Sequence, residues 1–288
     1  MTVSDPNSFW KYLVQIILKI GENHVYEQKN SAFYLFIPGR YRLNSLEIEK
    51  IFKDPRYPPV GTIIANCKLT SIIGIGGVAV VYQTFEIDLE LQRAMKMLKA
   101  DAAGYLRKKF EAEAKLTARL DHPNIVKVHG SGIYDGRLPF IHMEYIDGKS
   151  LRTLLTAHHT LPPAVCLSII TIVSSALEYA YAQSYSLWGK QGNKLVHRDL
   201  KPENILISNE GVVKVMDFGL SQFESGRNEG GWGTTPYMAP EQIDHQPADL
   251  RNDLYSMGVI LYELLCGVRP FPDDELLHER LKKQGKYQ

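Results

Sequence analysis

The stretch HRDLKPENIL, residues 197–206, decides the fold together with two stretches that follow it. VMDFGL occupies residues 215–220, and GTTPYMAPEQ occupies residues 233–242. Because the three stretches occur in this order, they are far more specific than any single glycine-rich or acidic motif.

A glycine-rich stretch, GIGGVAVVY at residues 74–82, lies upstream and admits three interpretations. It satisfies the dinucleotide-binding fingerprint G-x-G-x-x-G/A, it matches a loop that covers nucleotide phosphates, and it could be a plain glycine-rich hairpin. A dinucleotide turn must open a helix, whose N-terminus holds the pyrophosphate. Here the glycines lead into β-branched VAVVYQTF, which is strand sequence. The dinucleotide interpretation is therefore set aside.

The composition is that of a soluble globular protein, with 44% hydrophobic and 23% charged residues in a chain of 288. A net charge of +1 indicates neither nucleic acid nor an anionic membrane surface as a partner. Cys67, Cys166 and Cys266 show no metal or disulfide spacing, which predicts a reducing cytoplasm. No apolar run approaches the roughly 20 residues that span a bilayer, so no membrane span is expected.

Residues 1–60 are predicted to be an N-terminal extension or small module that ends in a linker. Phe9 to Ile20 has the apolar spacing of an amphipathic helix that packs on a neighbour. Two short apolar runs around Pro38-Gly39 predict a hairpin, and proline-rich DPRYPPVG at residues 54–61 predicts the linker. The function of this extension cannot be read from its residues.

The rest of the chain changes character near Gly148. Before it, strand-like runs dominate, and one helix is predicted over Tyr105 to Leu120. After it, the pattern predicts two long apolar helices, over Pro163 to Gln183 and over Leu250 to Cys266. The second is apolar on nearly every face and is therefore expected to be buried. A strand-rich half followed by a helix-rich half indicates an α+β protein of two lobes with a cleft between them.

Residues Leu69 to Phe271 resemble the eukaryotic-like serine/threonine protein kinase family, especially its bacterial members. The motifs that carry the resemblance, besides those quoted, are AMK with Lys96, FEAEAKL with Glu113, LDHPNIV, HMEYIDGKSL and DLYSMGVILYELLCG. The resemblance implies the two-lobed kinase fold. Its strand-rich N-lobe would span residues 61–146, and its helical C-lobe residues 147–288, without the last C-lobe helices.

The resemblance also implies a function, ATP-dependent phosphoryl transfer to serine or threonine hydroxyls of protein substrates, with Mg²⁺ or Mn²⁺. The alternative is a nucleotide-binding pseudokinase or scaffold that acts through protein partners. Such proteins usually lack the strand lysine, the catalytic aspartate or the metal aspartate, and all three are present here. A small-molecule phosphotransferase of similar fold is a third reading, but those enzymes generally lack the APE segment.

Four side chains are implied to take part in the transfer itself. Lys96 would hold the α- and β-phosphates, oriented by an ion pair with Glu113, for which Glu111 is the rival partner. Asp199 would accept the proton of the substrate hydroxyl, and Lys201 would neutralise the moving phosphoryl group.

The metal and the nucleotide have their own implied residues. Asn204 and Asp217 would bind Mg²⁺. Met143 would be the gatekeeper of the adenine pocket, and the backbone of Glu144 and Ile146 would bond the adenine edge. The full set expected around the nucleotide is Gly74, Gly76, Gly77, Val81, Ala94, Lys96, Met143, Glu144, Ile146 and Leu206.

Supporting residues follow from the same resemblance. His197 would be a packing residue and not a base, and Phe218 would pack in a position that reports the active or inactive state. Asp253, in a buried helix, would brace the catalytic-loop backbone, since a buried aspartate needs such donors. Thr234 would line the substrate pocket near Asp199.

Three departures from the family pattern stand out. Ala79 replaces the third glycine, which we expect to alter nucleotide affinity without abolishing binding. QSYSLWGKQGNKLV, residues 183–196, is longer than the usual connection and is predicted to be a polar surface loop with Trp188 exposed. Glu241 normally pairs with an arginine in later helices, and no such arginine is found in the sequence.

The segment after Asp217 is short and bears on activation. Arg198 would pair with a phosphate on Ser221 or Ser225, or with a built-in carboxylate from Glu224 or Glu229. A short segment has few residues to order, which favours the carboxylate. We therefore hypothesise basal activity without obligatory phosphorylation.

Overall fold

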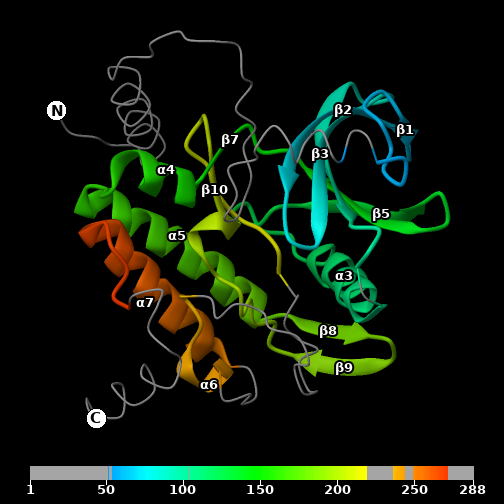
Figure 1. The fold of residues 1–288 in the computed structure, drawn as a ribbon. Coiled ribbons are helices and arrows are strands. Elements are labelled where there is room, and N and C mark those ends of the chain that lie inside the picture. The colour runs from blue at the N-terminus through cyan, green and yellow to red at the C-terminus, as the bar shows by residue number, and fades with distance from the viewer. Residues whose placement is uncertain (1–50, 52–53, 103, 219–235, 244–248, 272–288) are drawn as a thin grey trace, which may run out of the picture.

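A six-stranded antiparallel sheet forms the strand-rich lobe, in the order β1-β2-β3-β4-β6-β5 (Figure 1). The structure, a computed structural model, describes residues 51, 54–102, 104–218, 236–243 and 249–271. The strands are β1 (Ile63–Ile64), β2 (Cys67–Ile75), β3 (Ala79–Glu86), β4 (Leu91–Leu98), β5 (Val128–Tyr134) and β6 (Leu138–Glu144). The helix and hairpin expected within residues 1–50 lie outside the described residues, so the extension stays a prediction.

Alternation along the strands gives this sheet two apolar faces. Val80 and Tyr82 on β3 and Met95 and Met97 on β4 point into one cluster, as the two-residue period of a strand requires. The opposite face packs on α3 (Gly104–Thr117) through Phe110 and its neighbours. The helix is shorter than predicted, because the residues up to Leu120 form turns before the HPN segment. This second face also borders the helical lobe.

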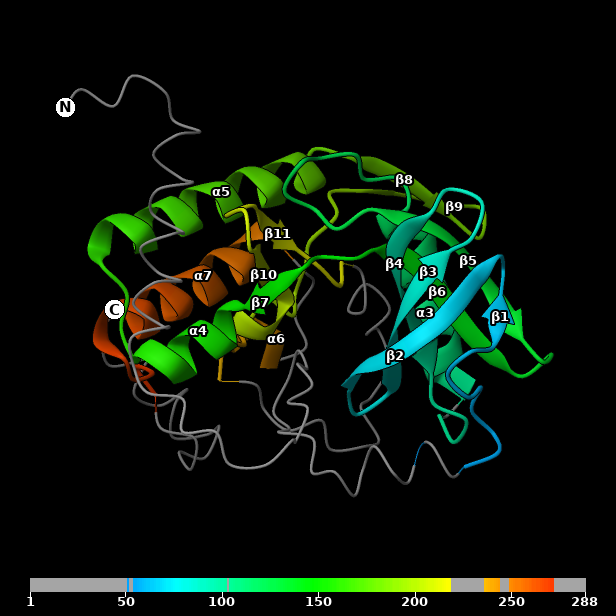
Figure 2. The ribbon, with the colours of Figure 1, turned by 90° about the horizontal axis from the view of Figure 1, so that it is seen from above.

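The helical lobe is built on two long helices that lie side by side, α5 (Pro163–Tyr181) and α7 (Leu250–Cys266) (Figure 2). The other elements are β7 (Gly148–Ser150), α4 (Leu151–His158), the 3-10 turn η1 (Pro202–Asn204), β10 (Ile205–Ser208), β11 (Val213–Val215) and α6 (Pro240–Ile243). β7, β10 and β11 form a small antiparallel sheet in the order β11-β10-β7. The strand-rich half and the helix-rich half predicted from the sequence are thus confirmed.

Local sequence explains where these helices begin and end. The Ser150 side chain caps α4 by accepting from Thr153 N, and prolines open α5. α7 begins with a capping box between Asp249 and Asn252 and ends at Gly267, whose φ of 73° suits a glycine. These signals place α7 at the bounds that the sequence predicts.

The surface of α7 differs from the prediction. Asp253, Met257 and Ile260 are buried, but Leu254 and Tyr262 are 51% and 45% exposed. The expected burial of this helix is therefore confirmed on one side only, and its other side is exposed. Apolar composition alone does not show which faces of a helix find a partner.

α5 corrects a second expectation, because it is apolar and long enough to cross a membrane by length and composition. The sequence analysis expected no apolar run of this length. Thr171 and Ser174 bond the carbonyls of Leu167 and Ile170 in their own helix, which hides their polarity. In the structure, Val173 and its buried neighbours pack in the core of the helical lobe, as in a core helix.

The predicted surface loop at residues 183–196 is a hairpin of β8 (Ser184–Leu187) and β9 (Lys190–Asn193). Trp188 and Gly189 form its turn with φ of 48° and 78°, the backbone of a tight two-residue hairpin. The polar composition of the segment concealed this strand pairing. Trp188 is 50% exposed, as expected.

The chain between α3 and β5 ties the two lobes together. Val126 N donates to Val215 O at 2.9 Å, and Val215 N donates to Asn124 O at 2.8 Å. Ile125 makes a parallel bridge to the same residue of β11. These bonds fix the strand-rich lobe beside the segment that leads into Asp217.

Candidate active site

Lys96 on β4 lies between two carboxylates contributed by different parts of the chain. Its Nζ is 2.7 Å from Glu113 Oε1 on α3 and 2.9 Å from Asp217 Oδ1 after β11. Lys96 and Glu113 are both buried, whereas Glu111 is exposed. The predicted ion pair is therefore present, and its partner is Glu113 and not Glu111.

Burial and charge act against each other in this trio. Burial alone would lower the pKa of Lys96, but the carboxylates of Asp217 and Glu113 outweigh it and raise that pKa above its ordinary value. Burial raises the pKa of Glu113, and the Lys96 ammonium opposes the rise. Burial also acts to raise the pKa of Asp217, but the nearby ammonium groups of Lys96 and Lys201 bring it below the ordinary value. Lys96 is therefore held as a cation.

The catalytic-loop residues predicted from the sequence form a compact hydrogen-bonded group. Lys201 Nζ lies 2.6 Å from Asp199 Oδ2. Asn204 Nδ2 donates to the backbone oxygen of Asp199 at 2.8 Å and lies 3.3 Å from its Oδ2. Because the side-chain nitrogen of Asn204 donates to Asp199, its side-chain oxygen is available to another partner.

Asp253 on α7 holds the backbone of this loop in place, as predicted. Its two carboxylate oxygens accept from His197 N at 2.8 Å and from Arg198 N at 2.7 Å. Arg198 needs such support because its φ of 64° is left-handed. His197 is fully buried, and its ring centre lies 4.7 Å from that of Phe218, so both residues pack as expected.

An apolar cluster between the sheet and the helical lobe contains most of the predicted adenine slot. Ala94 and Met143 are buried in it, and Val81, Ile146 and Leu206 pack against it. The cluster includes further residues that sequence reasoning missed, namely Ile73, Val78, Val128, Tyr145 and Met216. Their signal was the same apolar strand pattern, but no motif singled them out.

The glycine-rich stretch forms the turn between β2 and β3, as a strand-to-strand turn and not the start of a helix. Gly76 N donates to Ala79 O at 2.8 Å, and no helix follows. A Cβ added to Gly77 would meet no atom within 4 Å, and one added to Gly76 would make only an ordinary contact. Because the chain itself does not require glycine at these two positions, the glycines leave the backbone open to a ligand.

Ala79 is only 4% exposed, so its methyl group packs against protein atoms at the start of β3. We expect Ala79→Gly to change the Michaelis constant for ATP by less than about tenfold, equivalent to roughly 1.4 kcal/mol. We also expect a small fall in melting temperature, because glycine weakens a strand interior. Steady-state kinetics against ATP and a thermal melt check both. A larger change in the Michaelis constant would show that Ala79 tunes the nucleotide site.

The residues present fit a divalent metal that arrives with phosphates. Within the described ranges, no cluster of three or more His, Cys, Asp or Glu side chains could hold a metal unaided. Asn204 and Asp217 supply oxygen donors, and the Lys96 trio carries two carboxylates for one ammonium. Mg²⁺ typically takes one or two protein ligands and completes its shell with water and substrate phosphates. The oxygen donors of Asn204 and Asp217 fit this mode of metal binding.

A charged cluster beside the catalytic loop was not predicted. Arg152 on α4 lies 2.9 Å from Glu203 Oε1 through Nε and 2.8 Å from Glu263 Oε1 through Nη1. It also bonds the hydroxyl of Tyr237, which in turn bonds Glu263. The available signal was Glu263 itself, a carboxylate within an apolar helix, since a buried charge requires a partner.

Glu241, for which no arginine was found, accepts a hydrogen bond from Asn252 Nδ2 at 2.8 Å. The residue that helps to cap α7 thus also holds the start of α6. Thr234 and the candidate activation residues from Ser221 to Glu229 lie outside the described residues.

Comparison with known proteins agrees with this geometry. The model of the protein kinase domain family matches residues 67–287. The chain is 36% identical over 223 residues to the probable serine/threonine-protein kinase PknB of Bifidobacterium longum, covering 72% of this chain and 31% of that protein. It is 36% identical over 236 residues to the serine/threonine-protein kinase PknL of Mycobacterium tuberculosis, covering 80% and 54%. The chain therefore spans about a third to a half of the length of these relatives.

Solved structures agree as well. The crystal structure of the Mycobacterium tuberculosis PknI kinase domain is 26% identical, with a TM-score of 0.61, over 76% of this chain and 82% of that domain. The fold, the order of the motifs and the sequence matches lead to the same family. This chain belongs to the protein kinase domain family, and it is of the bacterial serine/threonine kinase type.

Proposed function

We propose that this protein transfers the γ-phosphoryl group of ATP to serine or threonine hydroxyls of protein substrates. One observation carries the proposal above the others. Lys96 is held as a cation between Glu113 and Asp217, and the same chain forms the Asp199–Lys201 contact of the catalytic loop. Phosphoryl transfer relies on this kind of positioning and charge neutralisation.

ATP is proposed to bind with its adenine in the apolar cluster that includes Val81, Ala94 and Leu206. Met143 closes the back of that slot, and the backbone of Glu144 and Ile146 bonds the adenine edge. Gly74, Gly76 and Gly77 cover the phosphates. Lys96 then bonds the α- and β-phosphates, and Glu113 keeps its ammonium in place.

In the transfer step, the substrate hydroxyl oxygen bonds to the γ-phosphorus as the bond from that phosphorus to the bridging oxygen of ADP breaks. Asp199 accepts the hydroxyl proton, and Lys201 stabilises the charge on the phosphoryl oxygens. Asn204 and Asp217 are proposed to hold Mg²⁺, which Mn²⁺ could replace. When bound, the metal would neutralise negative charge on the phosphates. The products are ADP and a phosphorylated protein.

The pseudokinase alternative has no observation in its favour. The strand lysine, catalytic aspartate and metal aspartate are present, and Lys96 has both of its carboxylate partners. We propose a signalling role in the cytoplasm, where ATP and Mg²⁺ are abundant. Free Cys67, Cys166 and Cys266 suit such a reducing compartment.

The test is incubation of the purified protein with Mg²⁺ and ATP labelled with ³²P at its γ-phosphate, using a generic protein acceptor. We expect label on serine and threonine after hydrolysis of the acceptor, and about a hundredfold less label, or lower still, with Asp199→Asn. Label that stays entirely in ATP, from a folded protein that binds the nucleotide, would refute the proposed function.

A further inference from the structure

The β8–β9 hairpin, which departs from the family pattern, lies against the C-terminal part of α3 (Figure 1). Arg119, just beyond α3, donates from Nη1 to the backbone oxygen of Ser186 at 2.7 Å. Lys115 Nζ lies 5.6 Å from the centre of the Trp188 ring, within the range of a cation–π contact. The hairpin therefore touches the helix that carries Glu113.

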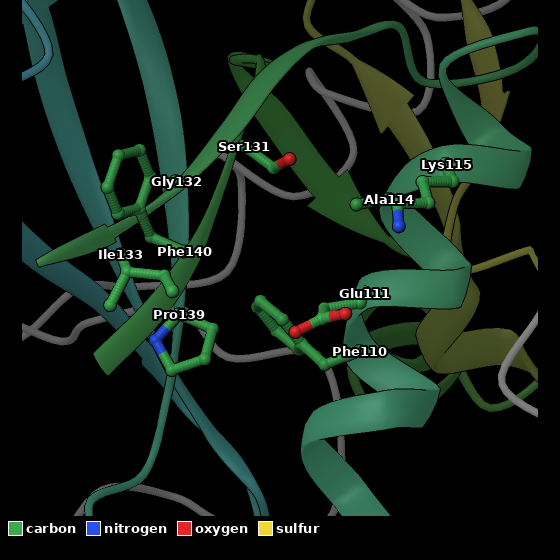
Figure 3. Close-up of a pocket in the computed structure, with 9 residues that line it drawn as sticks. All are labelled: Phe110, Glu111, Ala114, Lys115, Ser131, Gly132, Ile133, Pro139 and Phe140. Atoms are coloured by element: carbon green, nitrogen blue, oxygen red, sulfur yellow. The ribbon is translucent and has the colours of Figure 1, made fainter. Parts of the chain in front are cut away.

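A pocket of about 190 Å³, open to solvent, lies between α3 and strands β5 and β6. Figure 3 shows Phe110, Glu111, Ala114 and Lys115 of α3 on one side of it, with Ser131, Ile133 and Pro139 across from them. Phe110 and Ala114 still pack against the sheet. α3 also has attachments outside this pocket.

Those other attachments gather at the C-terminal end of α3. Thr117 Oγ1 donates to the backbone oxygen of Phe218 at 3.0 Å, next to Asp217. Lys115 and Arg119, on either side of Thr117 along the chain, make the two contacts with the hairpin. Glu113 lies one helical turn before Thr117, so a shift of this end of α3 would move Glu113 relative to Lys96.

The hairpin is anchored firmly enough to serve as a support. Leu187 is 5% exposed and belongs to the apolar core of the helical lobe. Trp188, next to it, has a left-handed backbone, which is an outlier for a bulky residue. Glycine would fit this turn without strain. Trp188 occupies this strained position and its ring contacts Lys115, which indicates that the contact has a function.

We propose that Trp188 and the Ser186 carbonyl are positioning groups that hold the C-terminal half of α3, so that Glu113 stays against Lys96. They act through Glu113 and touch neither ATP nor the acceptor. The effect on phosphoryl transfer rests on the proposed function, whereas the effect on α3 does not.

Trp188→Gly tests the proposal, because it removes the ring and relieves the strained turn, which keeps the hairpin folded. We expect amide hydrogen exchange in residues 110–117 to accelerate about fivefold or more, as local opening becomes easier. We expect kcat/KM for ATP to fall by about five- to tenfold, through loss of positioning. The Michaelis constant for the protein acceptor should not change.

Tyr105→Ala is the matched control. Tyr105 is also 50% exposed, lies on the same helix at its other end, and has Lys109 Nζ 6.0 Å from its ring centre. We expect this variant to keep wild-type exchange in residues 110–117 and wild-type kinetics. Lys115→Gln added to Trp188→Gly should cause no further change, because both remove one contact.

The outcomes separate the two proposals. Exchange in α3 that is unchanged in Trp188→Gly, or equally accelerated in Tyr105→Ala, would overturn the positioning role. A wild-type protein without transferase activity, in which Trp188→Gly still loosens α3, would refute the proposed function and leave the positioning role standing.

Discussion

We expect Asp199→Asn to lower the turnover number by about a hundredfold or more, which is the range for loss of a positioned general base. Asparagine keeps the shape of the side chain but cannot take up the hydroxyl proton. It also loses the charge that Lys201 Nζ contacts at 2.6 Å. The backbone bond from Asn204 to residue 199 does not need the carboxylate, so the loop should keep its conformation.

Two measurements distinguish this loss from unfolding. The affinity for ATP and the melting temperature of Asp199→Asn should both stay close to those of the wild type. Asp135→Asn serves as the control, because Asp135 is an exposed aspartate in the β5–β6 turn, and its surface ion pair with Arg137 is worth little. Equal turnover in Asp199→Asn and wild type would remove Asp199 from the mechanism.

We expect Asp217→Ala to abolish transfer and to weaken binding of Mg²⁺–ATP, because the proposed carboxylate ligand would be lost from the site. The substitution also deprives Lys96 of a partner at 2.9 Å and leaves the ammonium with Glu113 alone. Asp217 has a φ of 64°, a conformation in which alanine is strained. The alanine variant therefore combines three losses.

Asp217→Asn separates them, because asparagine tolerates this backbone better than other residues and keeps an oxygen donor. We expect transfer to fall about a hundredfold or more in this variant too, as one of the charges that neutralises the phosphates is lost. Its activity should respond to Mg²⁺ at higher concentrations than that of the wild type. A titration with MgCl₂ at fixed ATP measures this shift, and an unchanged Mg²⁺ dependence would show that Asp217 is not a ligand.

The family and the lobes could be predicted from the sequence because their signals are contiguous. HRDLKPEN and DFG are each read within a few residues, and helices such as α7 carry their own caps at Asp249 and Gly267. The choice of Glu113 over Glu111 was also possible, since spacing along a helix decides which of two neighbours faces inward.

What the sequence did not reveal depends on partners that are far apart along the chain. Arg152 meets Glu203 and Glu263 only after the helical lobe has assembled. The β8–β9 hairpin lacks the apolar alternation that marks most strands, and its pairing became visible only in the structure. Similarly, the exposure of Leu254 depends on what packs beside α7 and not on its own residue type.

The Arg152 cluster has an evolutionary consequence. Arg152 lies against both Glu203 and Glu263, so replacing the arginine alone removes the cation that these two largely buried carboxylates share, at a cost of up to about 3–5 kcal/mol. That is a large part of the stability of an ordinary domain. Substitutions at these three positions should therefore be inherited together among descendants of this chain. Lineages that lose the arginine should show neutral or apolar residues at both glutamate positions.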